Sequence, residues 1–412
     1  MNSSVTSGRS SGTQSGRQLG AGALAQALKR TRERTLGLID AWSMARPDLA
    51  VPCEPELNLP LWELGHIGWF QEWWIGRNDQ RPLGADCDPV HPRRPSRLPG
   101  ADALYDSSAV AHDLRWTLEL PDMQATRRYL EAVLNESLTL LNDAGSSDRA
   151  LYFWRLVLFH EQMHNEAMAY MARSQGIPLP EGLVHHRQGA PAEAREPAAA
   201  RDRPAAGTAG APITDTAQLE VQAQHWTLGN PPTGFAFDNE IGPHSVELAA
   251  FQIDARPVSW QQYLGFVQQT GHRLPPHVRP ESGRWQHFDG MRWDALDLES
   301  PAVHVSWDDA QAWCAWAGRR LPTEAQWECA AQTRPAMQWG TVWEWTDSVF
   351  ESFPGFVAHP YRDYSAPWFG SRKVLRGACM ATAAEMVDVR YRNFFPAHRR
   401  DIFAGFRTVG PA

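Results

Sequence analysis

Hydrophobic side chains recur at helical spacing along four stretches of the first 176 residues. These stretches are residues 23–42, 60–76, 125–145 and 150–176. In each stretch the apolar positions return every three or four residues, which places them on one face of a helix. The last stretch ends at Gly176, a residue type that commonly stops helices. The pattern predicts an N-terminal bundle of up to four helices, interrupted by a long irregular insert over residues 77–120.

The pattern changes at two other places in the chain. Residues 1–20 are rich in Ser and Gly, a composition that predicts disorder. Residues 185–218 are rich in Ala, Pro and Arg and lack apolar periodicity, so we expect a linker there. The resulting boundaries are a helical domain at residues 21–184 and a second domain at residues 219–412.

The second domain differs from the first in its pattern of apolar and turn-forming residues. Short strand-like pieces alternate with Gly, Pro and Trp residues, and two helical stretches stand out at residues 259–271 and 306–318. This mixture predicts an α+β domain with much irregular structure. We therefore expect a two-domain α+β protein.

Composition narrows the classes of function. A chain of 412 residues exceeds one ordinary core, and its formal net charge of −8 disfavours a protein that binds nucleic-acid backbones. No apolar run approaches the roughly 18 residues of a membrane span, and the N-terminus has no apolar leader segment. The five cysteines are scattered, which indicates reduced thiols and a cytoplasmic protein without membrane or nucleic-acid partners. The 19 tryptophans suffice for a core and for an aromatic cage around a cationic ligand.

The stretch FHEQMHNE carries two histidines that lie one helical turn apart. His160 and His164, at positions i and i+4, are able to reach one metal ion from one helix face. His66, in LGHIGWF, offers a third imidazole from a facing helix, where Gly65 and Gly68 allow close approach. The three histidines predict a metal site with open positions for water, substrate or oxygen.

Two other interpretations of these histidines stay open. HEQMH also fits the HExxH motif of zinc proteases, with Glu161 as the general base and His185 or His186 as the third ligand. The histidines are also compatible with polar groups that are satisfied within the core. Glu161 and Glu166 either orient the imidazoles or are solvated charges, and the sequence assigns them no role.

The second domain carries a series of motifs in a fixed order. They include PAVHVSWDDAQAWCAWAGRRLPTEAQWECAA (301–331), TVWEWTDS (341–348) and a terminal GFR. These motifs resemble the formylglycine-generating-enzyme-like fold, which is related to C-type lectins. True formylglycine-generating enzymes have a reactive cysteine pair in their C-terminal part, and Cys379 stands alone there. The resemblance therefore implies the fold without that activity.

Taken together, the two halves resemble the ergothioneine-type non-haem iron sulfoxide synthase family, which joins a DinB-like four-helix bundle to this fold. The resemblance implies that Fe(II) is held by His66, His160 and His164, and that hercynine and O2 are substrates. It matches Tyr364 to the tyrosine that donates a proton in the family, with Tyr361 as the nearby competitor.

The insert bears on which donor supplies the chalcogen. Its segment LYDSSAVAHDLRW (104–116) is similar to the selenoneine synthase branch, which joins 1-seleno-β-D-glucose to hercynine. In this interpretation Asp106 and Ser107 bind sugar hydroxyls, although both residues also fit an ordinary turn or helix N-cap. The arginines of residues 93–97 do not reproduce the pattern of members that use γ-glutamylcysteine. The alternatives are a hercynine sulfoxide synthase with a thiol donor (γ-glutamylcysteine or cysteine) and a non-catalytic, metal-binding, lectin-like protein.

The segment RYRNFFPAHRRDIFAGFR (390–407) supplies further candidates for substrate binding. Its arginines are able to clamp a carboxylate such as that of hercynine. We predict that Asn393, Asp401 and Arg407 lie at the substrate pocket.

Overall fold

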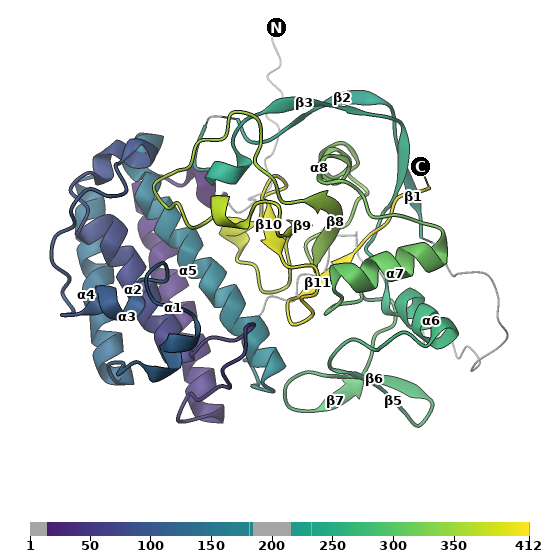
Figure 1. Ribbon diagram of the computed structural model, residues 1–412, viewed down its shortest axis with the longest axis horizontal. Helices are drawn as coiled ribbons and strands as arrows, with labels where there is room; N and C mark the ends of the chain where they lie inside the picture. The colour runs from purple at the N-terminus through teal and green to yellow at the C-terminus, as the bar shows by residue number, and fades with distance from the viewer. Residues whose placement is uncertain (1–14, 181, 184–215, 232, 412) are drawn as a thin grey trace, which may run out of the picture.

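The computed structural model describes residues 15–180, 182–183, 216–231 and 233–411. Four long helices form the N-terminal half, which confirms the four predicted helical stretches, and Figure 1 shows them grouped side by side. They are α1 (Ala21–Ala45), α2 (Pro60–Gln71), α4 (Met123–Asn142) and α5 (Asp148–Ser174). Asp122 and Ser147 cap the N-termini of α4 and α5 with their side chains. These helices pack on one another as a bundle, with α5 against both α1 and α2.

The insert between α2 and α4 contains short helical pieces. They are a π-helical turn at Glu72–Gly76, 3-10 helices at Arg81–Asp86 and Asp113–Thr117, and α3 (Ala101–Tyr105). The side chain of Tyr105 packs so closely on α2 that a Cβ atom at Gly65 would collide with its ring. The insert is therefore held against the helix turn that carries His66.

A four-stranded sheet forms the centre of the C-terminal half. Its strand order is β10-β9-β8-β11; β8 pairs with β11 in parallel, and the other pairs are antiparallel. The strands are β8 (Trp343–Val349), β9 (Lys373–Gly377), β10 (Asn393–Phe395) and β11 (Ala404–Phe406). Smaller sheets surround it: β1 (Gln218–Val221) with β4 (Phe251–Asp254), β2 (Gln224–Leu228) with β3 (His244–Leu248), and β5 (Val278–Glu281), β6 (Arg284–Phe288) and β7 (Trp293–Ala295).

Three helices accompany these sheets, and the two predicted ones are confirmed. They are α6 (Trp260–Thr270), α7 (Trp307–Ala317) and α8 (Glu324–Thr333). Capping boxes at Ser259, Ser306 and Thr323 begin them, and Gly271 and Gly318 end α6 and α7 in the left-handed conformation. The C-terminal half is thus an α+β domain.

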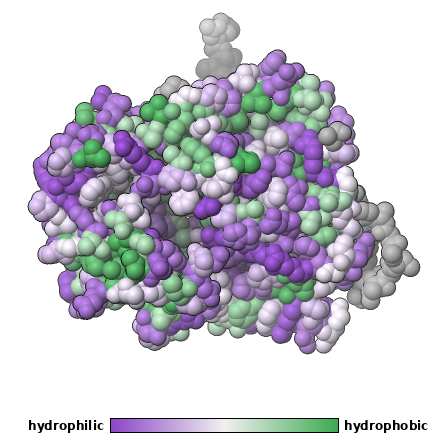
Figure 2. All heavy atoms as spheres, viewed as in Figure 1, coloured by the Kyte–Doolittle hydropathy of each residue, from purple (hydrophilic) through white to green (hydrophobic). Residues whose placement is uncertain are grey.

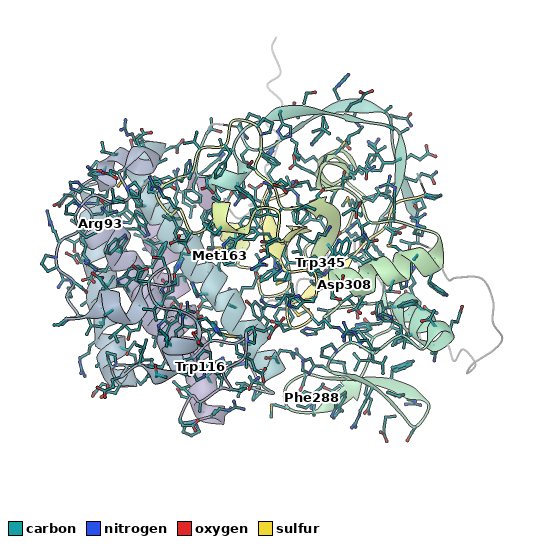
Figure 3. The ribbon with its side chains drawn as sticks, viewed as in Figure 1. Arg93, Trp116, Met163, Phe288, Asp308 and Trp345 are labelled. Atoms are coloured by element: carbon teal, nitrogen blue, oxygen red, sulfur yellow. The ribbon has the colours of Figure 1, made fainter. Side chains whose placement is uncertain are left out.

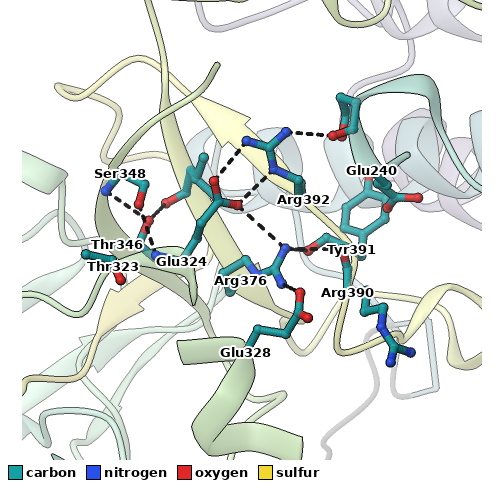
Figure 4. A network of polar contacts seen from close by, with 12 residues as sticks. Glu240, Thr323, Glu324, Glu328, Thr346, Ser348, Arg376, Arg390, Tyr391 and Arg392 are labelled. Atoms are coloured by element: carbon teal, nitrogen blue, oxygen red, sulfur yellow. Dashed lines mark hydrogen bonds and ion pairs between the residues drawn. The ribbon is translucent and has the colours of Figure 1, made fainter. Parts of the chain in front are cut away.

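Buried ion pairs lie between α8 and the central sheet (Figure 4). The guanidinium of Arg392 donates to both carboxylate oxygens of Glu324, at 2.8 and 3.0 Å. Arg376 donates to Glu328, and both side chains are almost fully buried. These charges are compensated by one another, so they act as structural links.

The start of the described chain joins the two halves. Residues 15–20, which composition assigns to a disordered segment, instead contain a 3-10 helix at Gly16–Gln18. Arg17 is buried and donates to Glu240 of the C-terminal half through both terminal nitrogens, at 2.6 and 2.8 Å. Residues 1–14 and the linker residues 185–215 lie outside the described chain. A single cluster of buried apolar residues runs through both halves, so the bundle and the sheet domain pack on each other directly.

None of the helices in the described ranges is both long enough and apolar enough to cross a membrane.

Candidate metal centre

Three histidines from two helices converge between α2 and α5. The nitrogen atoms that His66, His160 and His164 offer all lie within 4.8 Å of one another. The Nε2 atoms of His160 and His164 are 3.2 Å apart, as the i, i+4 spacing on α5 predicts. The predicted grouping of the three histidines is confirmed.

Hydrogen bonds fix the orientation of two of these rings. The Nδ1–H of His66 donates to the backbone oxygen of Tyr105 at 2.8 Å, and Nδ1 of His164 donates to the carboxylate of Glu63. Each bond leaves Nε2 as the free lone pair, which is the usual arrangement for a histidine that binds a metal. Glu63 is a functional candidate that the sequence interpretation missed, although its position three residues before His66 places it on the same helix face.

Aromatic rings hold the imidazoles from the sides. Trp62 stacks on His66, with ring centroids 4.8 Å apart, and Phe70 stacks on His160 at 3.5 Å. The stacking restricts rotation of both imidazoles. The cluster is therefore preorganised before any ligand arrives.

Burial keeps the cluster in the form that binds metals. Burial, followed by the neighbouring His164, lowers the pKa of His66 to about 3. Burial also lowers the pKa of His160 well below its usual value. Burial opposes ionisation of Glu63, but His164 outweighs it and lowers the pKa of Glu63 to about 2. Neutral imidazoles beside an ionised carboxylate suit a divalent cation.

The donor set fits the iron that the sequence resemblance implies. Three imidazole nitrogens without a thiolate suit Fe(II), and a set of three leaves open coordination positions. The zinc-protease interpretation requires Glu161 as a free general base. Glu161 is instead buried and binds Arg32 at 2.7 Å and Thr35 at 2.6 Å. His185 and His186 lie outside the described residues.

A cavity of about 900 Å³ opens beside the histidines, and both halves of the chain line it. Figure 2 shows a recess between the two halves, and Figure 3 places Met163 of α5 there. His160 and His164 form part of its wall, next to Glu166. The aromatic part of the wall consists of Tyr170, Trp343, Tyr361, Tyr364, Trp368, Tyr391, Phe394 and Phe395.

Comparisons with known proteins agree with this architecture. The sulfatase-modifying factor enzyme 1-like domain family matches residues 211–339 and 336–412. A hercynine oxygenase of Mycobacterium tuberculosis is 30% identical, over 93% of this chain and 97% of its own length. The chain belongs to the hercynine oxygenase family. A second hercynine oxygenase, from Mycolicibacterium thermoresistibile, is 29% identical over 92% of each chain. A formylglycine-generating enzyme of Streptomyces coelicolor is 30% identical over 38% of this chain.

Both tyrosines named from the family resemblance line the cavity of this hercynine oxygenase homologue. The ring of Tyr361 lies 6.0 Å from that of His160 and 4.9 Å from that of Phe70. Tyr364 stacks on Phe237 at 4.2 Å, and its hydroxyl is 2.9 Å from that of Tyr391. Of these two tyrosines, Tyr361 makes the ring contact with His160, and the ring of Tyr364 lies 5.8 Å from that of Tyr361.

The predicted substrate residues divide into two groups. Ser107 and Asn393 line the cavity. Asp106 accepts hydrogen bonds from the backbone and hydroxyl of Ser108, at 3.0 and 2.6 Å. These bonds form the ordinary turn that the sequence offered as the alternative to sugar binding. Asp401 is held by Arg399 through two bonds of 2.6 Å and does not line the cavity.

Arg407 contradicts its predicted role. Its guanidinium is fully buried, pairs with Glu344, and donates to the backbone oxygens of Asp254 at 2.8 Å and Gln338 at 2.6 Å. With every branch engaged inside the protein, Arg407 is a structural residue and not a substrate clamp.

Glu166, Arg115 and His112 line the cavity and had no predicted role. The carboxylate of Glu166 accepts from Trp343 and Thr382, both at 2.6 Å, and so links α5 to the C-terminal half. The guanidinium of Arg115 lies 3.8 Å over Trp62, and its buried Nε has no hydrogen-bond partner among the described residues. Arg115 therefore retains donors for a ligand.

Proposed function

We propose that this chain is a non-haem Fe(II)- and O2-dependent enzyme that bonds a chalcogen to the imidazole C2 of hercynine. The observation that carries the proposal is the three-histidine cluster, which opens onto a cavity shared by both halves. Relatives of nearly full length are named hercynine oxygenases. We assign the helical half to the DinB-like bundles on the same resemblance.

The cavity wall suits the charges that hercynine carries. A quaternary ammonium group binds well against aromatic faces, which Tyr170, Trp343 and Tyr391 supply near the carboxylate of Glu166. Arg115 and Asn393 offer donors for the carboxylate of hercynine. A zwitterionic substrate thus finds a complementary group for each end.

The residues of the chain divide the chemistry between them. Fe(II) bound by His66, His160 and His164 supplies the activation of O2 beside the substrate. We assign proton donation to Tyr364, with Tyr361, whose ring contacts that of His160, as the competitor. Burial, followed by Asp363, raises the pKa of Tyr361, and burial, followed by Tyr391, raises that of Tyr364. Both hydroxyls therefore keep their protons near neutral pH, which a proton donor requires.

We further propose that the donor is a selenosugar, 1-seleno-β-D-glucose, and that the chain is a selenoneine synthase. The arginines of residues 93–97 support a donor without carboxylates. Arg94 pairs with Asp79 at 2.5 Å, Arg97 pairs with Glu136 at 2.8 Å, and Arg93 lies over Trp73. These arginines do not line the cavity, whereas Ser107 and Ser108 do. Hydroxyl groups of this kind pair with sugar hydroxyls.

The test is turnover after anaerobic loading with Fe(II), with hercynine plus either selenoglucose or γ-glutamylcysteine, and products identified by mass spectrometry. A selenium adduct of hercynine from selenoglucose supports the full proposal. Product from the thiol alone would keep the hercynine chemistry and overturn the selenosugar. No product from either donor, with iron bound, would favour the non-catalytic alternative.

A further inference from the structure

A second cavity lies between the C-terminal end of α5 and the β5–β7 sheet. Its volume is about 300 Å³, at the lower end of the range for small-molecule sites. Figure 3 shows Phe288 of this sheet beside the end of α5. We name it the interdomain histidine cavity, because His277, His287 and His304 line it together with Arg173 of α5. It shares no lining residue with the cavity beside the metal centre.

The polar groups of the interdomain histidine cavity keep unused hydrogen-bonding capacity. Arg173 donates to the backbone oxygen of Phe288 at 2.6 Å, and no carboxylate of the described chain pairs with it. Nδ1 of His287 is buried and has no partner among the described residues. Nδ1 of His304 lies 3.1 Å from the backbone oxygen of Arg400, so it carries the proton and Nε2 is left as an acceptor.

The acidic groups around the cavity make their hydrogen bonds and ion pairs outside it, although Asp289 lies close enough to Arg173 for the two charges to attract each other. Asp289 accepts from the backbone of Met291 at 2.7 Å, Asp294 pairs with Arg292 at 2.8 Å, and Asp297 accepts from the backbone of Glu299 at 3.1 Å. Burial, followed by Arg173, lowers the pKa of both His277 and His287, and burial, followed by His277, lowers that of His304 to about 3. The cavity thus holds imidazoles whose pKa is lowered by burial, beside one guanidinium that forms no ion pair with a carboxylate of the described residues.

Aromatic side chains and two histidines with an uncommon backbone conformation belong to the same wall. Trp260, Phe288 and Phe403 supply aromatic surface around the polar groups. His277 and His304 adopt left-handed backbone angles, with φ of 65° and 62°, and their rings lie 5.3 Å apart. Non-glycine residues in this conformation are uncommon and gather at ligand sites.

We propose that the interdomain histidine cavity is a second ligand site, which binds a small carboxylate with an aromatic body. The carboxylate pairs with Arg173 and accepts a hydrogen bond from His287, while the body packs on the aromatic wall. Because Arg173 belongs to the bundle and His287 to the C-terminal half, the bound ligand links the two halves and stabilises the folded protein.

The test uses benzoate as the probe and benzamide as its neutral control, with full-length protein in a calorimetric titration and a thermal melt. Benzoate is expected to bind and to raise the Tm, and benzamide is not. Arg173→Gln should weaken benzoate binding at least about tenfold, the loss expected for a charge-assisted bond. His287→Leu should weaken it as well, which keeps the test decisive if one variant folds poorly.

Two matched arginine variants locate the bound probe. Arg149→Gln, an exposed change on the same helix, and Arg115→Gln, in the cavity beside the metal centre, should bind benzoate as the parent does. Loss of binding in Arg115→Gln instead of Arg173→Gln would place the probe in the other cavity and overturn the proposal. Equal binding of benzamide, or no binding of benzoate up to about 10 mM, would overturn it too.

Discussion

The bundle and the C-terminal domain both bury polar groups, but they satisfy them in different ways. His66 and His160 are each 2% exposed, and Arg407 and Glu344 are 0% exposed, so burial does not distinguish the two regions. The branches of Arg407 all meet acceptors inside the protein. By contrast, the Nε2 atoms of His66 and His160 face neighbouring imidazoles and not a hydrogen-bond donor of the fold.

This difference separates stabilising groups from binding groups. A buried charge whose partners are complete contributes to the fold and has nothing left for a ligand. Burying a cluster of nitrogen lone pairs that accept no hydrogen bond costs folding free energy unless a ligand binds those lone pairs. The comparison assigns Arg407 and Arg392 to the fold, and the three histidines to a ligand that accepts lone pairs.

Replacing a histidine of the cluster should have the largest effect on function and still leave the protein folded. His160→Ala removes one of the three proposed iron ligands, so we expect iron loading and turnover to fall at least about 100-fold. The variant should stay folded but lose some stability, because the change removes a buried ring that stacks on Phe70. Iron content by metal analysis measures the first effect, and His225→Ala, an exposed change on β2, is the control. Retained iron in the folded variant would contradict the comparison.

Replacing the buried arginine should do the reverse. Arg407→Ala leaves Glu344 buried without its partner, which costs about 3–5 kcal/mol of the free energy of unfolding. Denaturant unfolding measures this loss. Arg292→Ala, at the exposed pair with Asp294, should leave the unfolding midpoint almost unchanged. If Arg407→Ala proved as stable as the parent but lost substrate binding, Arg407 would return to the substrate pocket.

Glu63 tests how far the metal centre extends beyond its ligands. Glu63→Gln weakens the acceptor that orients His164, so iron affinity should fall about 10- to 100-fold. Glu161→Gln is the matched control on α5, because Glu161 binds Arg32 and Thr35 and not a histidine. Competition with a chelator gives both affinities. Equal affinities in the two folded variants would remove Glu63 from the centre.

Arg115 should show the smallest effect, confined to substrate binding. Arg115→Gln is expected to raise the KM for hercynine about tenfold, since one charge-assisted bond is lost, while iron content stays constant. Arg97→Gln, which alters a surface pair of the same insert, should leave the KM unchanged. A change in iron content in Arg115→Gln would mean that Arg115 supports the metal centre through Trp62.

Local spacing made part of this organisation predictable from the sequence. The helices follow from apolar periodicity, and His160 and His164 share a face because four residues make about one turn. Pairings across long stretches of chain were not predictable. Glu63 meets His164 across 101 positions, and Arg17 meets Glu240 across 223, so composition alone misassigned residues 15–20. Arg407 was misassigned because a sequence does not show whether a guanidinium is already paired with a carboxylate of the same protein.

The central claim is that the three histidines hold one iron ion. Anomalous diffraction across the iron edge, from crystals loaded anaerobically with Fe(II), tests it most directly. The account predicts a single iron peak bonded to Nε2 of His66, His160 and His164, facing the cavity. A peak bonded to other residues, or the absence of a peak between the three rings in iron-loaded crystals, would contradict it.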